Sequence, residues 1–235
     1  MAPFIVFEGC DGSGKSTQAK ALFRRLQREG CPSLLTHEPG GTPLGESIRR
    51  RLKAGWDVSP LSELFLFSAA RAQLVQSVVV PALRNGITVV CDRYTASTVA
   101  YQGYGRGLDL AMIGQVNRAA TDGLSPDLIV LLDLPSELTV DRKGKNVRDV
   151  FDGAPLEFHG KVREAYLYQA SQDPGRWLVL DATKPRQELT REVWNKVQPL
   201  LGRRGCCFLP RSGLPKPSGY PGISTRWGAG FYDAG

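Results

Sequence analysis

The sequence predicts an α/β fold, in which a five-stranded parallel sheet lies between two layers of helices. Five short apolar runs alternate along the chain with longer segments of helical period. The runs consist mostly of Val, Ile and Leu, which is typical of strands buried on both faces. A glycine-rich turn follows the first run directly. The expected strands are Phe4 to Phe7, Ser33 to Thr36, Ile87 to Cys91, Leu128 to Leu134 and Trp177 to Leu180.

Seven helices are expected to cover the two faces of this sheet. In the first, Ala19, Leu22 and Leu26 form one apolar stripe, and Gly30 marks its end. The chain shows no internal repeats. The expected helices are Ser16 to Glu29, Leu44 to Leu52, Leu61 to Arg84, Leu108 to Thr121, Ser136 to Arg142, Leu156 to Ser171 and Gln187 to Leu201.

The chain is long enough for one well-filled domain, expected over residues 1–201, followed by a tail over 202–235. The tail holds 8 Gly and 4 Pro with isolated aromatic residues and no period, so it cannot supply a packed core. It also holds a net charge of +4 out of the total of +7. The remaining excess is common for a protein that handles nucleotide phosphates, and we expect no nucleic-acid partner.

The five cysteines are an odd number without disulfide or zinc spacing, which predicts reduced thiols in a cytoplasmic protein. The first strand begins by Phe4, so we expect no signal peptide. No apolar run approaches the roughly 18 residues of a membrane span, and no membrane association is expected. The cysteines are Cys10, Cys31, Cys91, Cys206 and Cys207.

The turn after the first strand matches the pattern G-x-x-x-x-G-K-[ST], which predicts a phosphate-binding loop. Glycines let the backbone turn sharply and aim several N–H groups into one small cavity. Lys15 can reach the β- and γ-phosphates of a nucleotide, and the Ser16 hydroxyl can join the shell of a Mg²⁺ ion. A chance match is the alternative, but strand, loop and helix occur in the required order. The predicted loop comprises Gly9, Cys10, Asp11, Gly12, Ser13, Gly14, Lys15, Ser16 and Thr17.

Polar residues also follow the second and third strands, where an open parallel sheet binds its ligands. His37 to Thr42 follows the second strand, and Asp92 and Arg93 follow the third. The Asp92 carboxylate can hold Mg²⁺ through water, and the Arg93 guanidinium can bind a phosphate with two hydrogen bonds. A strand-end ion pair between the two is the alternative.

Together these motifs resemble the thymidylate kinase family of P-loop nucleoside monophosphate kinases, in its bacterial type. The resemblance covers roughly Phe4 to Leu201. It implies transfer of the γ-phosphoryl group of ATP to dTMP with Mg²⁺, and a homodimer packed through a long helix such as Leu61 to Arg84. The matching blocks are FEGCDGSGKST, EPGGTPLGESIR, LFSAARAQLV and CDRYTASTVAYQGYGRGL.

Other phosphate-loop proteins are the competing hypotheses. A GTPase would need N-K-x-D, but the only Asn-Lys pair, Asn195 and Lys196, is followed by Val197 and Gln198 inside a predicted helix. A kinase for deoxynucleosides or for another nucleoside monophosphate is closer. The Glu-Pro-Gly-Gly-Thr and Asp-Arg-Tyr blocks argue against it.

The resemblance also implies roles for residues of the acceptor site. Asp11, Arg71 and Arg93 match positions near the sugar and phosphate of dTMP, and Phe67 matches the residue that stacks on thymine. The positions of Thr98, Tyr101 and Gln102 read the base edge and exclude a ribose 2′-hydroxyl, and Pro39 is expected to line the same site. Ordinary alternatives are core packing for Phe67 and Tyr101 and a solvated helix face for Arg71.

The resemblance further implies a mobile lid over ATP at Asp141 to Gly153. Because the phosphate loop holds no Arg, the lid is expected to supply positive charge to the transferred group, from Arg148 or Arg142. A solvated charge run is the alternative. Glu157 is a candidate contact to Mg²⁺ or to the sugar. One departure from the family pattern concerns the lid, because Gly160 is expected to interrupt the helix that follows it. Another concerns a contact near the acceptor, where His37 stands in place of the usual Arg.

Overall fold

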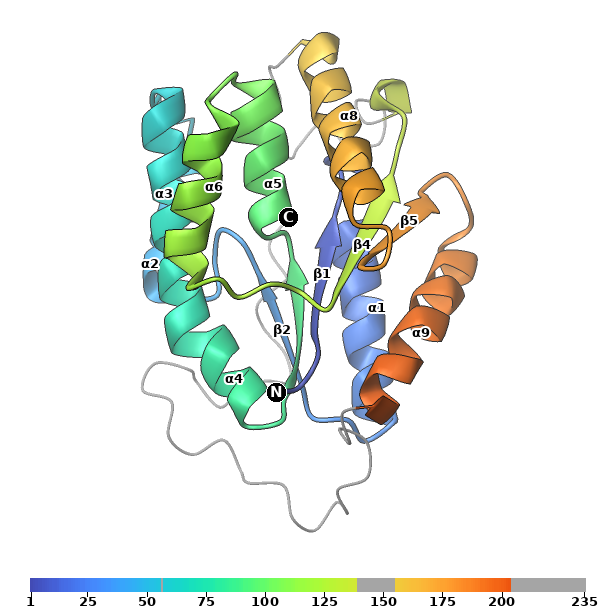
Figure 1. Cartoon of the computed structure of the whole chain (residues 1–235). Helices are drawn as coiled ribbons and strands as arrows, with labels where there is room; N and C mark the ends of the chain where they lie inside the picture. The colour runs from blue at the N-terminus through green and yellow to red at the C-terminus, as the bar shows by residue number, and fades with distance from the viewer. Residues whose placement is uncertain (56, 139–154, 204–235) are drawn as a thin grey trace.

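The computed structural model describes residues 1–55, 57–138 and 155–203. The predicted lid, Asp141 to Gly153, and the tail beyond Arg203 therefore lie outside the described residues. In the described part, helices cover both faces of one central sheet (Figure 1). The expected α/β architecture is confirmed.

The sheet has five strands in the order β2-β3-β1-β4-β5, and every neighbouring pair is parallel. Each strand begins and ends within one residue of a predicted apolar run. β1 lies in the middle, and all five of its residues are buried. The strands are β1 (Phe4–Glu8), β2 (Ser33–His37), β3 (Thr88–Asp92), β4 (Leu128–Asp133) and β5 (Trp177–Asp181).

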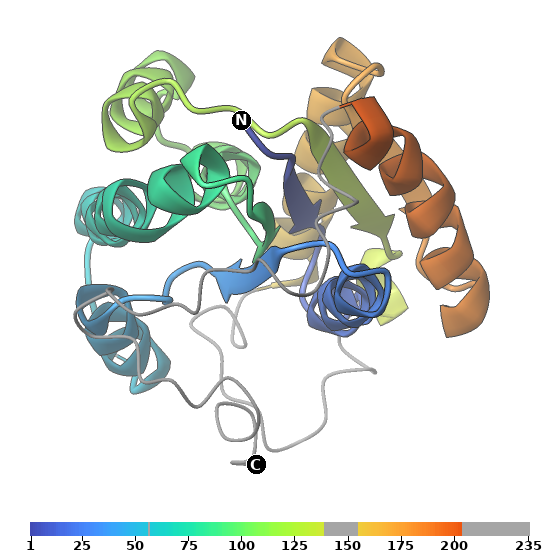
Figure 2. The same ribbon diagram turned by 90° about the horizontal axis from the view of Figure 1, so that it is seen from below.

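Side chains of alternate residues in β1 enter two different cores. Ile5 and Phe7 pack with α1 (Lys15–Arg28) and α9 (Arg186–Arg203) on one face. Phe4 and Val6 pack on the other face with η1 (Val75–Val79) and α4 (Val80–Arg84). Seen from below, the helices surround the sheet (Figure 2). The remaining helices are α2 (Pro43–Lys53), α3 (Pro60–Leu74), α5 (Thr95–Thr98), η2 (Val99–Gly105), α6 (Leu110–Thr121) and α8 (Leu156–Gln172).

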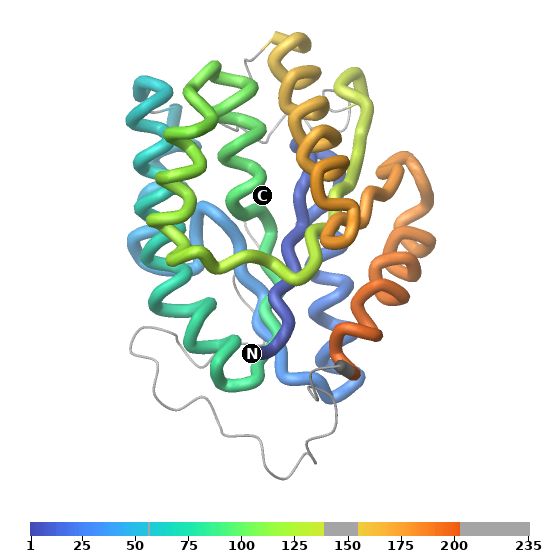
Figure 3. Tube along the Cα trace, viewed as in Figure 1, coloured from blue at the N-terminus to red at the C-terminus, as the bar shows by residue number. Residues whose placement is uncertain are grey.

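The helix predicted at Leu61 to Arg84 is present as α3, η1 and α4, with a π-helical stretch between two α-helical ones. The prediction placed no helix at α5 and η2, which follow β3 directly. This segment lies beside α3 and α6 along the Cα trace (Figure 3). It was missed because Ala100, Tyr101 and Gln102 are consecutive and all buried, so the segment has no amphipathic period.

The expectation that Gly160 interrupts its helix is wrong, because α8 continues from Leu156 to Gln172 without a break. Glycine costs only about 1 kcal/mol inside a helix. Val162, Ala165 and Tyr166 are fully buried in the core on that side of the sheet, and this packing outweighs the cost. Of the helix predicted at Ser136 to Arg142, residues 136–138 are helical and the rest is not described.

Two further expectations need correction. Within the described residues, the helix Pro60–Arg84 is long and apolar enough to cross a membrane by length and composition alone, contrary to the statement that no run approaches a span. Core packing accounts for much of this composition, because Leu64, Leu74 and Val79 are fully buried and the helix also buries Arg71 in an ion pair.

The cysteine prediction is wrong at one described position. Cys10 and Cys91 are free and buried, as expected, but Cys31 is disulfide-bonded. Sequence spacing does not show which segments meet in space, so it could not reveal this pairing.

Candidate active site

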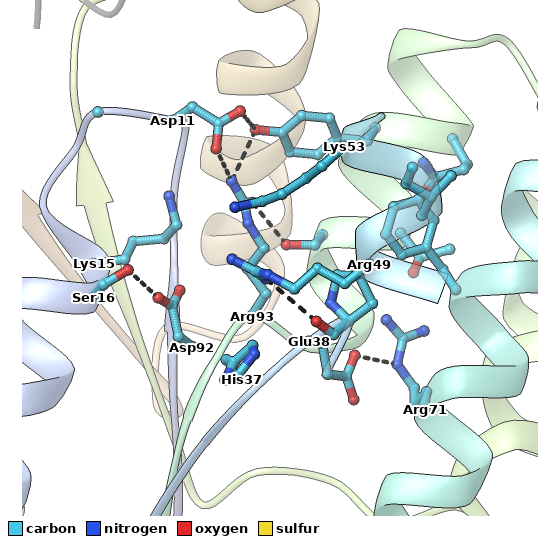
Figure 4. A pocket seen from close by; sticks show the side chains of 18 of the residues that line it. Asp11, Lys15, Ser16, His37, Glu38, Arg49, Lys53, Arg71, Asp92 and Arg93 are labelled. Atoms are coloured by element: carbon cyan, nitrogen blue, oxygen red, sulfur yellow. Dashed lines mark hydrogen bonds and ion pairs between the residues drawn. The ribbon is translucent and has the colours of Figure 1, made fainter. Parts of the chain in front are cut away.

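A cavity of about 390 Å³ lies at the carboxyl ends of β1, β2 and β3. Residues of the glycine-rich loop, the two polar strand ends, α2, α3 and η2 all line it (Figure 4). Parallel strands of an open sheet place their carboxyl ends at one edge, where ligands bind. Segments far apart in the sequence therefore meet at this edge.

The glycine-rich loop has the backbone that its sequence predicts. Gly9 and Gly14 have φ values of 138° and 93°, and a Cβ on Gly9 would lie 2.5 Å from the Leu132 carbonyl oxygen. Lys15 is buried, and its Nζ donates a hydrogen bond of 2.7 Å to the Cys10 carbonyl oxygen. Burial, and then the positive charge of Arg93, lower the pKa of Lys15. An anion in the cavity would relieve both effects.

Six of the nine predicted loop residues line the cavity. They are Asp11, Gly12, Gly14, Lys15, Ser16 and Thr17. Gly9, Cys10 and Ser13 are not among its lining residues. Cys10 is buried in the core, where burial raises the pKa of its thiol to about 11, so the thiol is protonated at neutral pH.

Ser16 and Asp92 form the part of the site that suits Mg²⁺. The Ser16 hydroxyl donates a hydrogen bond to Asp92 Oδ2, and both residues line the cavity. Among the described residues, no group of three or more His, Cys, Asp or Glu could hold a metal ion by itself. Mg²⁺ usually binds proteins through one or two oxygen ligands, with waters and substrate phosphates completing the shell. One hydroxyl and one carboxylate therefore fit this ion.

Glu157, the third predicted metal ligand, lies elsewhere. It is in the first turn of α8, forms an exposed ion pair with Lys161 and is not among the residues that line the cavity. The structure does not bring Glu157 to Ser16 and Asp92.

Arg93 is held in a fixed position at the mouth of the loop. Its φ of 74° is a left-handed value that non-glycine residues rarely adopt. Its guanidinium forms an ion pair with Asp11 and donates hydrogen bonds of 3.3 Å to the Gly9 carbonyl oxygen and to the Tyr101 hydroxyl. The Tyr101 hydroxyl in turn donates to Asp11 Oδ2, at 3.1 Å. Asp11, Arg93 and Tyr101 thus form one unit, and the alternative of an ion pair between Arg93 and Asp92 is not seen.

Arg71 is buried, with 2% of its side chain exposed, so the alternative of a solvated helix face is wrong. Its three nitrogen atoms each donate one hydrogen bond: Nε to Glu38 at 2.8 Å, Nη1 to Asn117 at 2.7 Å and Nη2 to the Tyr94 carbonyl oxygen at 3.1 Å. Burial raises the pKa of Glu38 to about 7, although Arg71 acts to lower it. Arg71 is therefore a rigid donor whose charge Glu38 neutralises when its carboxyl is ionised.

The remaining predicted acceptor residues also line the cavity: Pro39, Phe67, Thr98, Tyr101 and Gln102. Phe67 packs against Ile48 and Leu52 of α2 while one part of it faces the cavity. Tyr101 is buried with Tyr166 in a core cluster. Both aromatic residues thus combine the core role that periodicity indicates with a place in the site.

Sequence reasoning missed several residues that line the same cavity. Glu38 belongs to the polar stretch after β2 but was not selected. Arg49 and Lys53 lie four residues apart on α2, which places both on one helix face. This spacing, in a block already singled out, was the signal that could have found them.

His37, where the family pattern has Arg, ties the end of β2 to α2. Its Nε2 lies 3.1 Å from Glu46 Oε1, which also accepts a hydrogen bond of 2.9 Å from the Gly41 N–H. The hydrogen bond with His37, and then that with Gly41, lower the pKa of Glu46 to about 2 against the effect of burial. The imidazole therefore packs at the edge of the cavity and braces the loop of Glu38 to Thr42. Arg142 and Arg148, the lid candidates, lie outside the described residues.

The family model described as thymidylate kinase matches residues 7–193 of the chain. The chain belongs to the thymidylate kinase family. It is 48% identical to the thymidylate kinase of Dehalococcoides mccartyi strain 195, over 86% of this chain and 98% of that protein. It is 47% identical to the enzyme of Deinococcus radiodurans, over 83% of this chain and 95% of that protein.

A solved structure agrees with these sequence matches. The crystal structure of thymidylate kinase from Ehrlichia chaffeensis has a TM-score of 0.69 and 34% identity, over 84% of this chain and 99% of that chain. The predicted family, P-loop fold and enzyme class are therefore confirmed: the chain is a thymidylate kinase family phosphotransferase. The GTPase alternative is excluded.

Proposed function

We propose that this enzyme phosphorylates dTMP to dTDP by transferring the γ-phosphoryl group of ATP directly to the dTMP phosphate, in one in-line step assisted by Mg²⁺. One observation supports the direct transfer. A single cavity reaches from Lys15 and Ser16 of the phosphate loop to Phe67, Arg71 and Gln102. Two nucleotides bound at its two ends would meet end to end, without a phosphorylated enzyme intermediate.

On the donor side, main-chain N–H groups of the loop and the Lys15 ammonium bind the phosphates of ATP. Lys15 exchanges its hydrogen bond with the Cys10 carbonyl oxygen for one with a phosphate oxygen. Ser16 and Asp92 would hold Mg²⁺, which would supply positive charge to the transferring phosphates. The two residues already lie in contact, so little rearrangement is needed.

On the acceptor side, some residues supply positive charge and others supply shape. Arg93 and Arg49 line the cavity and suit the phosphate dianion of dTMP, because a guanidinium can bind two phosphate oxygens at once. Arg71 is already neutralised by Glu38, so it acts on the nucleotide as an oriented donor rather than as a net charge. The ring of Phe67 contacts the base, and Thr98 and Gln102 contact the polar edges of the base.

Three further parts of the predicted function belong to the same proposal. Arg148, or else Arg142, supplies charge to the transferred phosphoryl group from the lid. The enzyme forms a homodimer through the outer face of α3, where Leu61 and Phe65 are 42% and 52% exposed. Its place is the cytoplasm, where ATP and dTMP are available.

A coupled assay of ADP release across the nucleoside monophosphates tests the proposal. With ATP and Mg²⁺, kcat/KM should be at least about tenfold higher for dTMP than for dAMP, dGMP or dCMP. Chelation of Mg²⁺ with EDTA should abolish turnover, and added Mg²⁺ should restore it. ADP release at the same rate without any acceptor, or a stronger preference for another monophosphate, would contradict the proposal.

A further inference from the structure

Glu8, the last residue of β1, is a buried carboxylate that lies within the first matching block but was given no role there, and it does not line the cavity. It is fully buried and accepts four hydrogen bonds. The Tyr94 N–H, at 2.8 Å, and the Ser97 N–H, at 3.2 Å, donate to Oε1. The hydroxyls of Ser97, at 2.6 Å, and Tyr166, at 3.0 Å, donate to Oε2. Burying a charged carboxylate in the core costs free energy even when donors surround it, so the presence of Glu8 there calls for an explanation.

The same two hydroxyls are also acceptors for Arg93. Its Nη1 donates to the Ser97 hydroxyl at 3.1 Å and to the Tyr166 hydroxyl at 3.2 Å. Each hydroxyl thus lies between the guanidinium and the carboxylate, and the two hydroxyl oxygens are also within hydrogen-bond distance of each other, at 2.8 Å. Glu8 and Arg93 are linked through two parallel bridges, Ser97 and Tyr166, which come from α5 and α8.

The main chain beside Arg93 is fixed by the same carboxylate. Arg93 has a left-handed backbone, with a φ of 74° that non-glycine residues rarely adopt. The N–H of Tyr94, the next residue, donates to Glu8, and the Ser97 N–H, in the first turn of α5, does the same. Glu8 therefore holds both the guanidinium and the backbone that presents it.

We propose that Glu8, acting through Ser97 and Tyr166, is a positioning residue that sets the orientation of Arg93 for phosphoryl transfer. It faces Arg93 from the core side, while Asp11 holds the guanidinium from the cavity side. An ionised carboxylate has acceptor sites for all four hydrogen bonds. Burial raises the pKa of Glu8, and Arg93, Ser97, Tyr94 and Tyr166 oppose this rise.

The inference rests on the proposed role of Arg93 in binding the reacting phosphates, and Glu8→Gln tests it. The amide that replaces the carboxylate must turn an NH₂ group toward hydrogen-bond donors, so Arg93 is no longer held from the core side. We expect kcat and kcat/KM for dTMP to fall about tenfold to a hundredfold, as for a lost hydrogen bond to a charged group, while KM for ATP stays within about twofold. Tyr166→Phe keeps the ring and should lower kcat about tenfold.

The double variant Glu8→Gln/Tyr166→Phe should be no slower than Glu8→Gln alone, because both changes break the bridge from Glu8 to Arg93 through Tyr166. Asp127→Asn is the matched control for stability. Asp127 accepts the Phe4 N–H at 2.8 Å at the opposite end of β1, far from the site. We expect it to lower the thermal midpoint of unfolding without changing kcat.

The outcomes separate the two proposals. If the wild type does not phosphorylate dTMP, the proposed function fails. If the wild type is active but Tyr166→Phe and a folded Glu8→Gln both keep its kcat, or if the effects of the two changes on kcat multiply in the double variant, the positioning role of Glu8 is overturned. A loss of activity that only follows the fall in thermal midpoint, as in Asp127→Asn, would also overturn it.

Discussion

The two ends of the cavity are built in different ways. The proposed donor end comes from one continuous stretch, Gly9 to Thr17, six of whose residues line the cavity, and its proposed binding groups are mainly main-chain N–H groups and Lys15. The acceptor end is assembled from side chains at the ends of β2 and β3 and on α2, α3 and η2. A local sequence can specify the first, whereas the second exists only when distant elements meet.

The energetics of the two ends differ as well. The acceptor end buries the ion pair of Arg71 with Glu38. Removing one partner of such a pair leaves an uncompensated charge in the core. We therefore expect substitutions of Lys15 to affect mainly catalysis, and substitutions of Arg71 or Glu38 to affect catalysis and stability together.

Lys15→Ala should give the largest effect and leave stability nearly unchanged. The variant loses the ammonium that stabilises charge on the transferring phosphates, so kcat should fall by about a thousandfold or more. Initial rates of ADP release at saturating ATP and dTMP measure the loss, and thermal unfolding checks the fold. A kcat within tenfold of the wild type would show that the donor end is misassigned.

Arg71→Ala should change both properties. The loss of an oriented donor should lower kcat/KM for dTMP about a hundredfold with KM for ATP unchanged, and the orphaned Glu38 should cost about 3–5 kcal/mol of stability. Arg71→Lys is the matched control, since it keeps a charge beside Glu38 but loses the planar fork. It should recover stability more than activity. Equal turnover by the wild type and Arg71→Ala would contradict the acceptor site.

The pH dependence of dTMP use should show a smaller effect, of about two- to fivefold. Because the pKa of Glu38 is raised to about 7, the carboxyl takes up a proton below that pH and weakens its hold on Arg71. KM for dTMP should therefore rise as the pH falls from 8 to 6, and Glu38→Gln should flatten the profile.

The raised pKa of Glu38 makes the stability of the fold depend on pH in the opposite direction. The folded state holds this proton more tightly than the unfolded state, so the contribution of Glu38 to the free energy of unfolding should fall as the pH rises from about 4.5 to 7. A His37→Gln variant separates any contribution of the imidazole. A KM for dTMP that stays constant as the pH falls from 8 to 6 would show that the pairing of Arg71 does not depend on the Glu38 charge.

The sequence alone determined the strands, most of the helices and the donor loop. Each strand is a short apolar run, and the loop needs glycines and a lysine at fixed spacing, so both are local features. The helix formed by α5 and η2 was missed because its residues are buried on several sides and show no period.

Tertiary structure alone decided the partners of the charged groups. Arg71 meets a glutamate 33 residues away, and Glu8 meets Tyr166 at a separation of 158. No sequence period reports such pairs, because a hydrogen bond depends on distance in space. The motif residues could thus be named from the sequence. Glu8 and Glu38 lie inside the matching blocks, but their hydrogen bonds to Tyr166 and Arg71 became visible only when the sheet and its helices brought these residues together.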